Sequence, residues 1–90
     1  MVYVDEATYP WRGKKWCHLT ADNLAELHQF AAKLKLKREW FQNKRIPHYD
    51  ITESKRLKAI ELGAIAISTK EMVRRVRETL AIKDHHRQKD

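Results

Sequence analysis

The sequence predicts one small α/β domain in which a mostly parallel sheet of four strands is covered by three helices. Its 90 residues are enough for a single hydrophobic core. Short apolar packets of strand type alternate with segments of helical periodicity, which gives the element order β-β-α-β-α-β-α. Strands that alternate with helices are typical of a largely parallel sheet.

The first two strands are expected at residues 2–4 and 15–19. Residues 6–14 between them contain Pro10 and Gly13 and are predicted to form a loop. A loop of about ten residues allows either a wide hairpin or a short parallel crossover. The relative direction of these two strands therefore stays open.

The first helix is expected to begin after Thr20 or Asp22, because either side chain can accept a hydrogen bond from a first-turn amide. Leucine and alanine residues recur at helical spacing after this point, and the helix should end near residues 34–36. Residues 37–47 are predicted to form a short helical turn followed by a loop.

The second helix is predicted between two further strands. The strands are expected at residues 48–51 and 64–67, and the second of them is apolar throughout, as in a strand buried on both faces. The helix should cover residues 53–62, with Thr52 as its N-cap and Gly63 as its left-handed C-terminal stop. Its inward-facing residues are expected to include Leu57 and Ile60.

The third helix is predicted to begin with a capping box, in which Ser68 and Glu71 bind each other's backbone amides. Its apolar residues continue to Leu80. Residues 83–90 have no apolar content to bury and are expected to form a flexible tail. The sequence thus predicts one domain over residues 1–82.

The formal net charge of +7 favours anionic partners, although surface lysines and arginines often serve solubility alone. A nucleic-acid-binding protein would use the basic region at residues 33–45 and the arginines of the third helix. No apolar run approaches the roughly 18 residues of a membrane span, and no secretion signal is recognised. The single cysteine, Cys17, excludes an intrachain disulfide, so we expect a cytoplasmic protein without a membrane partner. Self-association stays open.

Polar residues gather where the predicted strands end. If the later strands run parallel, residues 18–20, 50–56 and 68–69 meet on one edge of the sheet, where open α/β folds bind ligands. The start of the second helix offers free amides and partial positive charge to an anion. The predicted ligand-binding residues in this segment are Tyr49, Thr52, Ser54, Lys55 and Arg56.

His48 and Asp50 are two apart on a strand and share one of its faces, and His18 can join them from a neighbouring strand. Such a group suits acid–base catalysis, and these three are the candidate catalytic residues. Two histidines and a carboxylate also form a common metal-ligand set, but their spacing matches no specific motif, so no metal or cofactor is predicted. Asp5 is expected to join the ligand site only if the first strand runs parallel to the second.

Several segments resemble a family of small bacterial and phage proteins catalogued as a domain of unknown function, numbered four thousand and thirty-one. These are Val4-Asp5, Cys17-His18-Leu19, Glu26-Leu27-His28, Trp40-Phe41-Gln42, and above all His48-Tyr49-Asp50-Ile51-Thr52 with Ser54-Lys55-Arg56, Ala59 and Gly63-Ala64. The resemblance covers roughly residues 2 to 68. It brings no established activity, but it implies that the segment from His48 to Arg56 is functional. The presence of the family in phage genomes implies a role in host defence, counter-defence or nucleotide metabolism.

The leading hypothesis is a binding module for a phosphorylated, nucleotide-like small molecule at the strand-to-helix turn of residues 48–56. One alternative is an enzyme that acts on such a molecule with the histidine and aspartate side chains as acid and base. Another is a nucleic-acid-binding protein that uses its basic surface, whose affinity would fall steeply with salt. The sequence does not decide whether turnover occurs.

Overall fold

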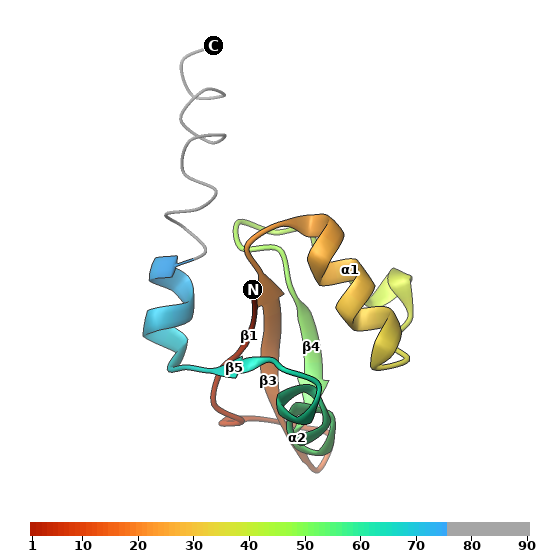
Figure 1. Cartoon of the computed structure of the whole chain (residues 1–90). Coiled ribbons are helices and arrows are strands. Elements are labelled where there is room, and N and C mark those ends of the chain that lie inside the picture. The colour runs from red at the N-terminus through yellow and green to blue at the C-terminus, as the bar shows by residue number, and fades with distance from the viewer. Residues whose placement is uncertain (76–90) are drawn as a thin grey trace.

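Strand β3 (Lys14–Ala21) is the centre of the fold, because other strands pair with both of its edges. In the computed structural model, which describes residues 1–75, β4 (Tyr49–Thr52) lies antiparallel along one edge of β3. Strands β1 (Val2–Val4) and β2 (Tyr9–Trp11) are both antiparallel to β3 as well. The short strand β5 (Ile65–Ala66) pairs in parallel with β1 (Figure 1).

The pairing register places β1 and β2 on the same edge of β3. Leu19 is paired with Val4 on one side and with Tyr49 on the other. Trp16 is likewise paired with Tyr9 of β2 and with a residue of β4. Strands β1 and β2 therefore follow one another along the edge opposite β4, and the chain leaves the sheet between them at residues 5–8.

The prediction of a mostly parallel, four-stranded sheet is wrong, since the sheet is mixed and has five strands. Helix α1 (Leu24–Lys33) carries the chain back along the sheet, as in a parallel crossover. The chain then runs along the sheet a second time, through the short helix η1 (Arg38–Trp40) and the loop after it. This second passage brings β4 in beside the end of β3, so the two strands are antiparallel.

Strand β2 was expected to be part of a loop. It is joined to β3 by a two-residue turn in which Arg12 has φ of 52° and Gly13 has φ of 72°. Two positive φ values are the signature of a type I′ hairpin turn. Pro10 is tolerated in β2 because the strand is exposed and extends the sheet only at its margin.

Two helices pack on one face of the sheet. Helix α1 begins with Asn23, whose side chain accepts a hydrogen bond from the Glu26 amide, and not with Thr20 or Asp22. Helix α2 (Glu53–Glu61) is capped by Thr52 as predicted. Its expected inward residues are wrong: Leu57 is 57% exposed, Ile60 is 36% exposed, and Ala59 is the buried residue. The core beneath these helices contains Val2, Val4, Cys17, Leu19, Leu27, Phe30, Ala31, Leu34, Tyr49 and Ile51.

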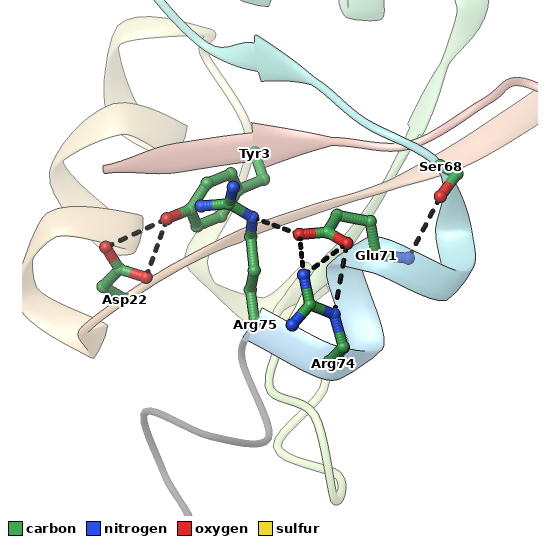
Figure 2. A network of polar contacts seen from close by, with 6 residues as sticks. All are labelled: Tyr3, Asp22, Ser68, Glu71, Arg74 and Arg75. Atoms are coloured by element: carbon green, nitrogen blue, oxygen red, sulfur yellow. Dashed lines mark hydrogen bonds and ion pairs between the residues drawn. The ribbon is translucent and has the colours of Figure 1, made fainter.

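A helical segment at residues 69–75 covers the opposite face of the sheet. Its Met72 is 3% exposed and forms a second small cluster with Tyr3, against which three isoleucines pack. The Ser68 hydroxyl accepts from the Glu71 amide, which is one half of the predicted capping box. The Glu71 carboxylate binds Arg74 and Arg75 and not the Ser68 amide, so the other half is wrong (Figure 2). The expected end of this helix at Leu80 and the tail from residue 83 lie outside the described residues.

Strand β5 is also less buried than predicted, since Ile65 is half-buried and Ala66 is exposed. It lies at the margin of the sheet, where only one edge is paired. Among the residues that the structure describes, no helix is long and apolar enough to cross a membrane.

Candidate functional site

The polar side chains converge on the face of the sheet opposite α1 and α2. Alternation along β1 sends Val2 and Val4 into the core under α1 and sends Tyr3 and Asp5 to the other face. Alternation along β3 does the same for Cys17 and His18. His18 and Asp50 are direct partners across the β3–β4 ladder, so their side chains are neighbours on that face.

Asp5 is the most connected residue of this group, although its side chain is only 1% exposed. One carboxylate oxygen accepts from the His18 backbone amide at 2.6 Å. The other accepts from His18 Nδ1 at 2.8 Å and from the Thr69 hydroxyl at 2.8 Å. The Asp5 carbonyl accepts from Arg56 Nε at 2.6 Å. Asp5 thereby joins β1, β3, α2 and the helical segment at residues 69–75.

The pKa values of Asp5 and His18 move in opposite directions. Burial alone would raise the pKa of Asp5, but the hydrogen bonds from His18 and Thr69 outweigh it and hold the pKa below its usual value. The hydrogen bond to Asp5 raises the pKa of His18 against the effect of burial. Asp5 is therefore an ionised acceptor that fixes the orientation of the His18 ring.

Asp5 was expected to join the site only if β1 ran parallel to β3, and this expectation is wrong. Strands β1 and β3 are antiparallel, and Asp5 nevertheless contacts His18. The expectation assumed that His18 stands at the end of its strand. In the structure β3 continues to Ala21, so His18 lies inside the strand and faces the point where the chain leaves β1.

His48 and Asp50 meet His18 from the other edge of β3. His48 Nδ1 donates to the Ile46 carbonyl at 2.7 Å, which turns its Nε2 toward Asp50 Oδ1, 3.5 Å away. His18 Nε2 lies 3.9 Å from the same oxygen. The two imidazole rings meet edge to face with their centroids 5.0 Å apart. The second Asp50 oxygen accepts from Gln42 Nε2, which an isolated bridge between Gln42 and His48 holds in place.

A cavity of about 260 Å³ opens beside the two histidines. The helical segment at residues 69–75 forms one wall, and the loop before β4 forms another. The floor and walls are mostly apolar, while two cations and one hydroxyl stand among them. The lining residues are His18, Lys44, Arg45, Ile46, His48, Thr69, Met72 and Val73.

The predicted residues at the start of α2 form contacts inside the fold. The Thr52 hydroxyl accepts from the Lys55 amide and lies 3.2 Å from the Ser54 hydroxyl. The Lys55 ammonium donates to the Leu34 carbonyl at the end of α1, and Arg56 donates to Asp5 as described. These four side chains therefore do not line the cavity beside His18 and His48.

Two other candidate side chains point into the core. Tyr49 is 1% exposed and its hydroxyl lies 2.9 Å from Nδ1 of His28 on α1. Cys17 is 1% exposed, and burial raises the pKa of its thiol to about 12, which keeps it protonated and unreactive. Both alternate with the residues of the site, and they lie on the opposite face of the sheet.

Sequence reasoning named Gln42 only within the Trp40-Phe41-Gln42 segment of the family resemblance, and it placed neither Gln42 nor Lys44 and Arg45 at the site. Gln42 precedes the strand and reaches the site only because the chain runs along the sheet twice. Lys44 and Arg45 counted only as part of a basic region. Thr69 belonged to a segment expected at the site, and it binds Asp5.

A protein-family model described as "Protein of unknown function (DUF4031)" matches residues 2–79. The match includes the helical segment at residues 69–75, which lay beyond the resemblance drawn over residues 2 to 68. No curated protein and no solved structure matches the chain. Because the family model covers most of its 90 residues, the chain belongs to the DUF4031 family.

Proposed function

We propose that this protein binds a phosphorylated, nucleotide-like small molecule in the cavity beside His18 and His48. The observation that carries the proposal is a concave, mostly apolar site with Lys44, Arg45 and the Thr69 hydroxyl at its walls. Such a composition suits a ligand with an apolar body and an anionic group. An arginine can hold two phosphate oxygens through parallel hydrogen bonds, and a lysine adds a point charge.

The size of the cavity limits the ligand. At about 260 Å³ it is slightly below the roughly 300–1,000 Å³ of common ligand pockets. A phosphate with the sugar or base next to it suits this volume better than a dinucleotide. We propose that this binding takes place in the cytoplasm of a bacterial or phage-infected cell, where such molecules are abundant.

The proposed anion site differs from the sequence prediction, which placed the anion at the first turn of α2. Lys55 and Arg56 already donate to backbone carbonyls, so they hold the fold together whether or not a ligand binds. His48 belongs to the predicted segment and stays in the proposed site, while Lys44 and Arg45 replace Lys55 and Arg56 as the charged partners.

The proposal can be tested by titrating nucleoside phosphates, sugar phosphates, inorganic phosphate and unphosphorylated nucleosides into the protein, with calorimetry as the readout. The double variant Lys44→Ala/Arg45→Ala should weaken the binding of a phosphorylated ligand by about 10-fold or more, because charge-assisted hydrogen bonds are lost. The variant Lys14→Ala/Lys15→Ala removes the same charge from the exposed start of β3 and is the matched control.

Equal losses in the two double variants would show that only net charge matters and would contradict the cavity as the binding site. Short oligonucleotides belong in the same titrations. If they alone bind, and their affinity falls steeply with salt in both variants, the basic surface is the functional feature and the protein is a nucleic-acid binder.

Turnover of the bound molecule is a second candidate function, and the cluster of His18, His48 and Asp50 at the cavity favours it. These side chains can transfer protons or hold a metal ion. Product formation from the bound ligand, followed by phosphorus NMR with and without divalent metal, tests this function. Binding without any product under both conditions would leave a binding module.

A further inference from the structure

We propose that Nε2 of His18, Nε2 of His48 and a carboxylate oxygen of Asp50 bind one divalent transition-metal ion such as Zn²⁺. One ligand atom from each of these residues lies within 4.8 Å of the others. Asp50 Oδ1 is 3.5 Å from one Nε2 and 3.9 Å from the other. Metal–ligand bonds of 2.0–2.2 Å in a tetrahedral site put neighbouring ligand atoms roughly 3.3–3.6 Å apart. Small side-chain shifts are enough to close the site around an ion.

The hydrogen bonds at Nδ1 decide which nitrogen faces the site. A backbone carbonyl only accepts, so His48 Nδ1 must carry a proton to bind the Ile46 carbonyl. The Asp5 carboxylate likewise accepts from His18 Nδ1, so the ring proton lies between these two atoms. In the neutral form of each ring, Nε2 then carries a lone pair that faces Asp50. A proton on one ring can relieve the repulsion among these groups, whereas a metal ion is bound by all three at once.

All three ligands are held by a second layer of contacts, as protein metal sites require. Asp5 holds His18, the Ile46 carbonyl holds His48, and Gln42 holds Asp50 through its other oxygen. A carboxylate bound to the far nitrogen of a metal-ligating histidine is the usual arrangement around zinc. His18 and Asp50 also sit on paired strands, which fixes their separation more firmly than loops would.

Three protein ligands leave one position of a tetrahedral ion for another group, which is the pattern of catalytic rather than structural zinc sites. His18 and His48 both line the cavity, so an ion bound by them would lie at its wall. A water molecule or a ligand oxygen can occupy that position. Metal binding by the three residues does not depend on the proposed function, since it is tested with the metal alone.

The test begins from the variant His85→Ala/His86→Ala, which removes the two neighbouring histidines of the C-terminal sequence as a competing metal site. Calorimetry with Zn²⁺ alone should show one equivalent bound to this full-length chain. Adding Asp50→Asn or His48→Gln should weaken binding by about 100-fold or more, because a ligand is lost. His28→Gln is the matched control and should leave the affinity unchanged.

A second measurement needs no change to the ligands. In the His85→Ala/His86→Ala variant three histidines remain. Long-range proton–nitrogen NMR spectra of this variant should show that Zn²⁺ shifts the Nε2 signals of His18 and His48 but not those of His28. If Zn²⁺ does not bind to the His85→Ala/His86→Ala variant, the proposal is overturned. Binding that survives both Asp50→Asn and His48→Gln, or that leaves the two Nε2 signals in place, would overturn it as well.

Discussion

The Asp5 side chain accepts a backbone hydrogen bond that the backbone carbonyl of a strand residue would normally accept. Where the chain leaves β1, one carboxylate oxygen accepts the His18 amide and so continues the pairing along β3. The other oxygen binds the His18 ring and Thr69. A single buried carboxylate therefore closes a gap in the sheet and orients the first histidine of the candidate site.

Replacing Asp5 by alanine should lower the free energy of unfolding by on the order of 3 kcal/mol, since the His18 amide and the Thr69 hydroxyl lose their acceptor. Glu6→Ala, at the exposed neighbouring position, is the control and should change it little. Urea denaturation of both variants measures the difference. A loss below about 1 kcal/mol for Asp5→Ala would mean that water replaces the carboxylate at small cost.

The residue pattern along the strands supports the prediction that His48, Asp50 and His18 lie together, because alternation and cross-strand pairing are local properties. The meeting of Asp5 with His18 depends on how far β3 extends, which the apolar packet at residues 15–19 does not show. Gln42 belongs to the family resemblance, but no local pattern places it at the site, because its position there results from the path of the chain after α1.

At the scale of elements, α1 and α2 end in the same way with different residues. In each helix the two amides after the C-cap bind the second- and third-last carbonyls, as Lys35 and Leu36 do in α1. The residue after the cap is left-handed in both cases. It is Gly63 with φ of 111° in α2, but Lys35 with φ of 61° in α1.

Lys35→Gly should raise the free energy of unfolding by about 0.5–1 kcal/mol, because glycine adopts this φ without the strain of a Cβ atom. Gly63→Ala should lower it by about 2 kcal/mol. An added Cβ at Gly63 meets no atom within 4 Å, so that loss comes from the backbone alone. Thermal unfolding of the two variants checks the opposite signs, and a stabilised Gly63→Ala variant would contradict this explanation.

The order of helices and strands could be predicted apart from β2, but the direction of the strands could not. Caps such as Thr52 and stops such as Gly63 are local signals, and both occur as expected. Whether β4 is parallel to β3 depends on whether residues 34–48 run once more along the sheet, and hydrophobic periodicity does not report this path. Strand β2 was missed because Pro10 and an exposed surface are typical of loops.

At the scale of the whole molecule, His28 connects elements that are distant in the sequence. Its Nδ1 lies 2.9 Å from the Tyr49 hydroxyl on β4. Its ring packs edge-on against the Phe41 ring, with the two ring centroids 4.6 Å apart. Burial, with a smaller contribution from Arg38, lowers the pKa of His28. The folded protein therefore takes up a proton at His28 less readily than the unfolded chain does.

This difference makes the stability of the molecule depend on pH. Above the ordinary histidine pKa near 6.5, His28 does not lower the free energy of unfolding. As the pH falls below that value the free energy of unfolding decreases, because the unfolded chain is protonated first. A His28→Gln variant should lose less stability than the unmodified protein between pH 7 and pH 5. Urea titrations across this range give the comparison, and parallel curves for the two proteins would show that His28 does not contribute.

The hydrogen bond between the His18 amide and Asp5 also gives the protein a built-in spectroscopic reporter. An amide that donates to an ionised carboxylate at 2.6 Å should resonate far downfield of the other strand amides. The same carboxylate group binds the His18 ring through its second oxygen, so any change at the ring alters the charge that this proton senses. One resolved peak in a routine proton–nitrogen spectrum would then follow events in the cavity, without any label or substitution in the site.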